Sequence, residues 1–197
     1  MRGRVAPGRL VVARQALAAA DLLRGEWRPG VVRPHAWVRM GDGPEELVWL
    51  DFITAPSGSR NGDDFSVASR LLAPNLAAHQ VAHFELEQPL IRESAVEPAI
   101  LRLTVGGFSA RGADVRMQDL LRERIPAISR EMTEAYVGRR IVGRAVEVTF
   151  ISTWIRAAAD RSLAEPLWPD IAVRYDTFYL GLYRPLTDTE EASATPG

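Results

Sequence analysis

The chain has 197 residues, of which 47% are hydrophobic and 25% are charged, a composition typical of one medium-sized or two small globular domains. Its net charge is -1 and it has no cysteine. These features exclude disulfides, thiolate metal sites and thiol nucleophiles, and they provide no electrostatic footprint for nucleic acid or an anionic membrane. All 24 basic side chains are arginine, which also excludes a lysine Schiff base and the lysine of a phosphate loop.

Residues 1–30 predict an N-terminal helical arm. The helix is expected over Leu10–Leu23, with Gly25 as its stop signal. Charged residues interrupt the apolar stretch, and no segment reaches the roughly 20 apolar residues that a membrane-spanning helix needs. We therefore expect a cytoplasmic protein with no membrane partner. Four apolar residues share the predicted helix face: Leu10, Ala13, Leu17 and Ala20.

Residues 31–97 predict a divergent α+β half. Strands at His35–Met40 and Glu46–Ile53 flank the turn sequence Gly41-Asp42-Gly43-Pro44, which indicates a hairpin. A short helix is expected after Asp64, and Val81–Glu87 alternates as a strand. The proline-bounded segment 89–98 is the expected internal boundary. The short helix would align Phe65, Ala68, Leu72 and Leu76 on one face.

Residues 98–185 predict a second α+β half. Strands are expected at Ile100–Val105, Ala145–Ile155 and Ala172–Tyr183, with a long helix over Val115–Tyr136 that Pro126 must kink. Residues 186–197 lack apolar periodicity and predict a disordered tail. Strands that alternate with two central helices favour an α+β fold with an antiparallel sheet.

The order of four sequence features in residues 100–184 resembles a known family. Leu101-Arg102-Leu103-Thr104-Val105 precedes the helix with Pro126, a later strand closes on Ser152-Thr153-Trp154, and Tyr175–Leu180 forms the last strand. This region resembles the dimeric α/β-barrel domain of the antibiotic biosynthesis monooxygenase type. The resemblance implies a ferredoxin-like unit that pairs sheet to sheet. Residues 31–97 would then be a second half-barrel, so the barrel would form within one chain or in a homodimer.

The strand that ends at Trp154 carries the first candidate site. Phe150, Ser152 and Trp154 alternate along it and share one face. Such a face suits a small apolar or aromatic ligand, with the Ser152 hydroxyl as a polar anchor. For these residues we favour packing in the core over ligand binding, because a strand tryptophan among aliphatic residues is usually buried there.

Tyrosines in the last strand extend this candidate site. Tyr175, Tyr179 and Tyr183 recur every four residues, which places them on one face of the predicted strand. Tyrosines so placed line either a cavity or a subunit interface. We assign Tyr175 and Tyr179 to the ligand-binding set with Phe150, Ser152 and Trp154.

Other polar residues support weaker alternatives. His79 and His83 would share a helix face and could bind a metal, but the glutamate of the HExxH motif is missing, so we favour surface histidines and expect no metal. Arg139, Arg140 and Arg144 could bind an anion or stabilise the carboxyl end of the preceding helix, which we favour. No nucleotide fingerprint is present, and we expect no cofactor.

These observations leave the function class open. The resemblance implies a cofactor-independent monooxygenase that acts on an aromatic or polyketide-like substrate. A non-catalytic ligand-sensing or dimerisation module is the alternative, because no convincing acid–base constellation is present. A third hypothesis is an interaction protein that uses the N-terminal helix and the tyrosine strand as contact surfaces. Whether the chain is an enzyme is not decided by its sequence.

Overall fold

The computed structural model describes residues 1–28, 31–52, 61–86, 96–109, 132–155 and 175–187, with positions 112, 115–117, 119–120 and 123 between them. The chain divides into two compact units. The first unit comprises Met1–Val81 with Pro185–Gly197, and the second comprises Ala82–Arg184. This division differs from the domain boundaries expected near residues 30 and 97. The expected tail from residue 188 onward lies outside the described residues.

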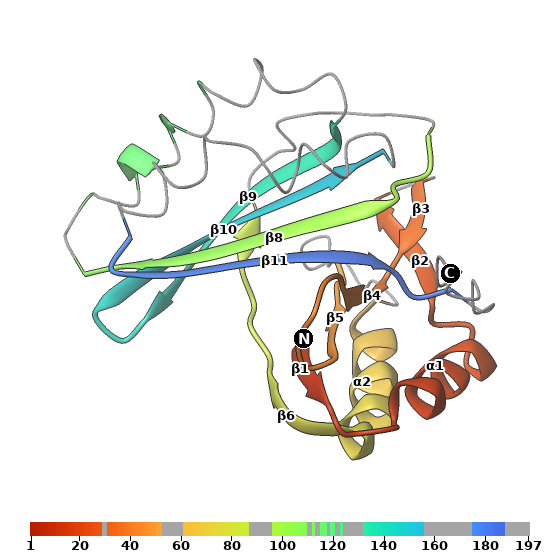
Figure 1. Ribbon diagram of the computed structural model, residues 1–197. Helices are drawn as coiled ribbons and strands as arrows, with labels where there is room; N and C mark the ends of the chain where they lie inside the picture. Colours follow the sequence, from red (N-terminus) through yellow and green to blue (C-terminus); the bar gives the residue numbers. More distant parts are fainter. Residues whose placement is uncertain are drawn as a thin grey trace. The chain divides into compact units, whose positions relative to one another are not determined.

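The first unit contains one sheet, one small ribbon and two helices (Figure 1). In the sheet the strand order is β6-β1-β5-β4, and all three neighbouring pairs are antiparallel. β2 and β3 form a separate antiparallel ribbon. The elements are β1 Arg2–Val5, α1 Leu10–Ala19, β2 Arg24–Arg28, β3 Val31–Pro34, β4 Ala36–Arg39, β5 Glu46–Trp49, α2 Asn61–Leu72, a 3-10 turn Ala73–Asn75, and β6 Leu76–Gln80.

Helix α1 confirms the predicted helix but ends before the expected stop at Gly25. Asp21 adopts a left-handed φ of 55°, its N–H donates to the carbonyl of Ala18, and Leu22 N–H donates to that of Leu17. This pattern is the Schellman motif, in which a left-handed residue satisfies the last free carbonyls of the helix. A polar residue that tolerates this conformation therefore ends the helix in place of a glycine.

One face of the first sheet packs against both helices, so α1 is part of the core and not a detached arm. Ala13 and Leu17 of α1, with Leu72 of α2, are fully buried. Burying a leucine side chain contributes about 1.5–3 kcal/mol, which holds each helix on the sheet. Removal of residues 1–28 would take β1 and α1 out of this core. The buried core residues are Val5, Ala13, Leu17, Leu22, Leu23, Ala36, Val38, Leu47, Trp49, Ala68, Leu72 and Leu186.

The remaining predictions for this half meet mixed outcomes. The hairpin is confirmed, because β4 pairs with β5 in antiparallel register. The second helix is confirmed but begins at Asn61, three residues before the expected cap. The predicted strand Val81–Glu87 is wrong: β6 ends at Gln80, and within 81–86 only Glu85–Leu86 is extended in a sheet. The sequence of β6, Leu76–Gln80, shows no alternation of apolar and polar residues by which to recognise a strand, since four of its five residues are exposed.

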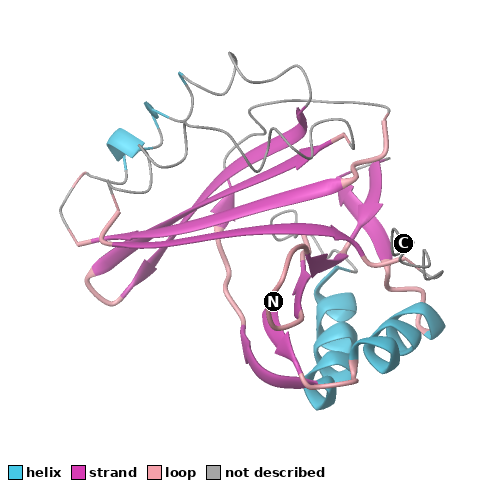
Figure 2. Cartoon of the chain, viewed as in Figure 1, coloured by secondary structure: helices cyan, strands magenta, loops and turns pink. Residues whose placement is uncertain are grey.

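The second unit is an antiparallel sheet with strand order β11-β8-β10-β9-β7, in which the long strands lie side by side (Figures 1 and 2). The predicted strands at 100–105 and 145–155 are confirmed as β8 and β10, which pair along their length. The last strand begins at Thr177, so Tyr175 precedes it. The strands are β7 Glu85–Leu86, β8 Ile100–Phe108, β9 Met132–Val142, β10 Ala145–Trp154 and β11 Thr177–Pro185.

The predicted long helix over Val115–Tyr136 is wrong at its carboxyl end. Residues 115–117 are helical, but Met132–Val142 is strand β9, which pairs with β10. Gly143, with a φ of 62°, opens the two-residue turn between them, as glycine does in type II′ hairpins. Both faces of β9 are buried over its first seven residues, so apolar residues stand at consecutive positions. They therefore fit a helical stripe as well as a strand. Pro126 lies outside the described residues.

Both units have the same strand order. In each unit four strands of the sheet, numbered one to four in chain order, are arranged four–one–three–two. These strands are β1, β4, β5 and β6 in the first unit, and β8, β9, β10 and β11 in the second. The α+β class and the antiparallel sheet are thereby confirmed. Among the described helices, none combines the length and the apolar character needed to cross a membrane.

Candidate functional site

Strand register divides the second sheet into two faces. Phe150 lies opposite Thr104 and Ser152 lies opposite Arg102, so these side chains share one face, which Trp154 and Ile100 extend at the strand ends. We call this the Trp154 face. Phe150 and Ser152 are fully buried, and Trp154 is 1% exposed. The sequence therefore predicted the grouping of these three residues correctly, and all three are buried.

Trp154 and Ser152 form a direct polar contact on this face. The indole Nε1 donates a hydrogen bond of 2.9 Å to the Ser152 hydroxyl oxygen. Two residues apart on a strand, the two side chains point in the same direction, so the contact needs no departure from regular geometry. Because a hydroxyl both donates and accepts, this bond uses Ser152 as an acceptor and leaves its proton for another acceptor.

Tyr175 lies on the same face although it is outside the strand. A Cβ on Gly106 would lie 1.7 Å from the ring carbon Cδ1 of Tyr175, so the ring occupies the space that the glycine leaves. Its ring centroid is 4.5 Å from that of Phe108 and 5.3 Å from that of Phe178. Burial raises the pKa of the Tyr175 phenol well above its ordinary value, so at neutral pH the hydroxyl remains protonated and can donate.

Tyr179 does not join this group. It pairs with Val105 of β8, whose side chain points away from the Trp154 face. There its hydroxyl contacts that of Tyr183, four residues along the strand. Gly181 makes room between them, since a Cβ at that position would approach both phenol oxygens within 2.7 Å. Tyr179 and Tyr183 share one face, as their four-residue spacing predicts. Tyr175 lies on the other face, because it precedes the strand and does not follow its alternation.

The sequence interpretation missed three residues on the Trp154 face. Phe108 and Phe178 flank Tyr175, and Arg102, which is 1% exposed, lies opposite Ser152. The alternation Leu101-Arg102-Leu103 places the arginine on the face opposite the two leucines. Both faces of β8 are buried, however, so the alternation of residue types along this strand does not distinguish buried from exposed side chains.

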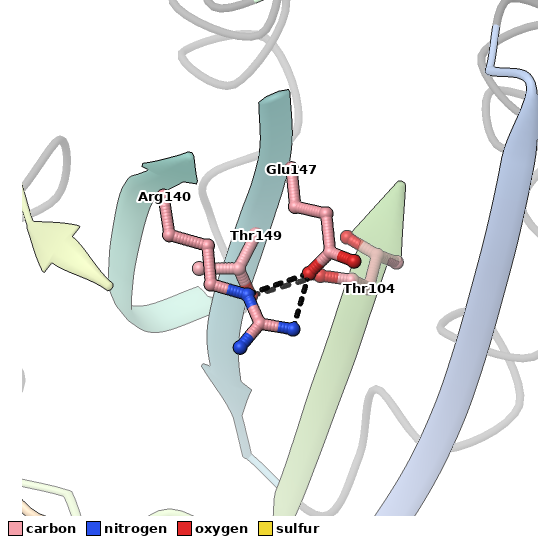
Figure 3. Close-up of polar contacts among 4 residues, drawn as sticks. All are labelled: Thr104, Arg140, Glu147 and Thr149. Carbon is pink, nitrogen blue, oxygen red and sulfur yellow. Dashed lines mark hydrogen bonds and ion pairs between the residues drawn. The ribbon is translucent and has the colours of Figure 1, made fainter. Parts of the chain in front are cut away.

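Polar side chains also connect the strands directly (Figure 3). The Thr149 hydroxyl donates to the carbonyl of Thr104 over 3.0 Å, and Arg140 contacts Glu147 Oε2 through Nε at 2.7 Å and Nη2 at 2.6 Å. Arg140 belongs to β9, so the expected role of this arginine cluster at a helix end is wrong. The guanidinium also lies 5.0 Å from the centroid of the Phe84 ring. These contacts join β8, β10 and β9 in the register that their backbone pairing gives.

Histidines and carboxylates form no metal centre in the described part of the chain: no three of them come together there as ligands. His79 lies in β6 opposite Gly3, and His83 follows that strand, so they do not share a helix face. His35 is buried in the first unit, where it contacts Trp49.

The fold defines an α+β protein whose two units repeat one antiparallel strand order. Among solved structures, the chain is similar to a Fusobacterium nucleatum subsp. nucleatum protein named "Putative monooxygenase", with a TM-score of 0.56 and 9% sequence identity. The match covers 94% of this chain and 90% of that chain, so it spans both units. No protein-family model matches the sequence. No curated protein matches it either. At this identity the likeness concerns the fold alone.

Proposed function

We propose that the chain is a small-molecule-binding protein of the dimeric α/β-barrel, ferredoxin-like type. Its aromatic ligand would lie on the Trp154 face. The observation that carries this proposal is the convergence of Tyr175 on the face that already holds Phe150, Ser152 and Trp154. Aromatic rings with a few hydroxyl groups are the usual lining of sites for aromatic ligands. The cytoplasmic location belongs to the same proposal.

The reaction that fits this face best is oxygenation without a bound cofactor. In it, an activated aromatic methylene reacts with O2 and becomes a carbonyl, while the second oxygen atom leaves as water. The substrate supplies the four electrons that O2 accepts, so no external reductant is needed. Tyr175 would donate a hydrogen bond to a substrate oxygen, and the positive charge of Arg102 would stabilise the anion from which electrons leave.

A non-catalytic ligand sensor is the second candidate. On the Trp154 face, the described residues of β8 and β10 include no histidine and no carboxylate. A base that removes a substrate proton would therefore have to come from another part of the chain or from solvent. Binding without turnover is the outcome that this observation favours.

Oxygen uptake separates the two candidates. Purified protein would be mixed with a panel of anthrones and hydroquinones, and O2 consumption and tryptophan fluorescence would be recorded together. Uptake above the spontaneous rate supports the oxygenase, and a saturable fluorescence change without uptake supports the sensor. If neither signal changes across the panel, the ligand site on the Trp154 face is wrong.

Two phenol-to-phenyl variants locate the site. Tyr175→Phe should weaken ligand binding about fivefold to tenfold, because a buried hydrogen bond contributes about 1 kcal/mol. Tyr136→Phe is the matched control, since Tyr136 lies opposite Ile151 on the other face and donates to Glu134. Equal effects of the two variants would contradict the assignment.

The assembly is part of the same proposal. Two sheets of this strand order complete a barrel in the family that the chain resembles, either within one chain or between two copies. The mass in solution distinguishes these alternatives. A value of 21.8 kDa supports the single-chain barrel, and twice that value supports the homodimer.

A further inference from the structure

The repeated strand order places two tryptophans at equivalent positions. Trp49 ends β5 and lies opposite Ala36, the first residue of β4. Trp154 ends β10 and lies opposite Met132, the first residue of β9. In the order of the four strands that the two units share, each tryptophan is thus the last residue of the third strand. The residue two places earlier is Leu47 in one unit and Ser152 in the other.

This difference changes the polar environment of the indole. Ser152 accepts the hydrogen bond of Trp154, whereas Leu47 offers no acceptor. Trp49 is fully buried, and its Nε1 has no hydrogen-bond partner in the part of the chain that the structure describes. A buried indole N–H without an acceptor destabilises the folded state, and buried polar groups are almost always hydrogen-bonded.

His35, whose ring contacts that of Trp49, provides a second buried polar atom. The two ring centroids are 5.0 Å apart at an interplanar angle of 87°. His35 is 4% exposed, and its Nε2 also has no hydrogen-bond partner among the described residues. Its backbone is held on both sides, since its N–H donates to Leu23 and its carbonyl accepts from Leu50. The ring packs on Gly25, where a Cβ would lie 2.5 Å from its Cε1.

The two atoms have complementary chemistry. An indole N–H can only donate, whereas an imidazole nitrogen without a proton accepts. Burial lowers the pKa of His35 to about 4, so the ring is neutral at pH 7. A hydroxyl group can accept from the indole and donate to the imidazole at once. Trp49 belongs to the apolar core with Leu22 and Leu23, so the rest of such a ligand must be apolar and uncharged.

We propose that His35 and Trp49 form the polar end of a second small-molecule site, within the first unit, that binds the hydroxyl group of a small phenol. This site is separate from the Trp154 face and does not depend on its function. The inference rests on the buried, unpartnered polar atoms of two rings that contact each other, and on Leu47 at the position that corresponds to Ser152.

Phenol, anisole and benzene are the probes that test the proposal. Phenol can make both hydrogen bonds, anisole can only accept, and benzene can do neither. The protein has five tryptophans, and Trp49→Phe identifies the indole signal of Trp49 in a proton–nitrogen NMR spectrum. Phenol should shift that signal and the side-chain nitrogens of His35, and it should bind about tenfold more tightly than anisole.

Two variants distinguish this site from the Trp154 face. His35→Phe retains a ring but removes the acceptor, so phenol should lose about tenfold in affinity and bind like anisole. Ser152→Ala should move the indole signal of Trp154 and leave the phenol response of Trp49 unchanged. The comparison of the three probes uses the unaltered protein, so the test stands even if a variant folds poorly.

Two results would overturn the proposal. The first is equal binding of phenol, anisole and benzene, which would mean that only apolar contact matters. The second is an indole signal of Trp49 that exchanges magnetisation with water and does not respond to phenol. In that case both polar atoms serve a buried water alone.

Discussion

The indole Nε1 of Trp154 donates a hydrogen bond of 2.9 Å to the Ser152 hydroxyl oxygen, and both groups are buried. Strand pairing gives Trp49 the same position in the other unit, where Leu47 replaces the serine. The two units share one strand order, but only in the second unit does the buried indole N–H have a serine as its acceptor. This difference separates the site proposed on the Trp154 face from the one proposed at His35.

Ser152→Ala should lower the free energy of unfolding by about 1–3 kcal/mol, because the indole N–H of Trp154 would remain buried without its acceptor. Urea unfolding followed by circular dichroism measures the loss. The double variant with Trp154→Phe removes the donor as well and isolates the pair energy, which we expect to be about 1 kcal/mol. Additive effects of the two substitutions would show that the bond contributes nothing.

Gly106→Ala should destabilise the second unit by about 1–3 kcal/mol, because the new Cβ would overlap the ring of Tyr175 and displace it. Ligand binding at the Trp154 face should fall with it. Gly43→Ala is the matched control: no atom lies within 4 Å of the added carbon, and the unfolding free energy should change by less than about 0.5 kcal/mol. Thermal unfolding of both variants compares them directly.

Acid should destabilise the protein through His35. Burial lowers its folded pKa from 6.5 to about 4, so the unfolded chain binds the proton more readily. The stabilisation from the neutral ring is complete above pH 6.5 and is lost as the pH falls toward 4, by about 3 kcal/mol in total. His35→Phe should remove this part of the pH dependence. A pH profile that is the same in both proteins would contradict the assignment.

The Arg140–Glu147 pair should contribute little to stability (Figure 3). Its contacts are short, but both side chains are partly exposed, at 19% and 24%, so solvent screens the interaction. A double-mutant cycle with Arg140→Ala and Glu147→Ala should give a coupling free energy of about 0.5–1 kcal/mol. The coupling should shrink in 1 M salt, where the Debye length is about 3 Å. A coupling that salt does not change would mean that packing on Phe84 dominates.

Part of the fold could be read from local pattern. The strands that became β4, β5, β8 and β10, together with helices α1 and α2, follow from runs of apolar residues bounded by turn sequences. β9 could not be recognised, because a strand buried on both faces carries no alternation. Its apolar residues matched a helical period by chance, and only pairing with β10 shows that the segment is extended.

The candidate site divides in the same way. Phe150, Ser152 and Trp154 share a face because strand residues alternate, so the sequence by itself determined their grouping, the α+β class and the absence of thiol and lysine chemistry. The tertiary structure decided that Tyr175 lies over Gly106, that Tyr179 faces the other way, and that His35 contacts Trp49. The physical reason is that the backbone of a single strand is enough to direct successive side chains to opposite faces. Contacts between distant segments depend on register and on the space that neighbouring side chains leave.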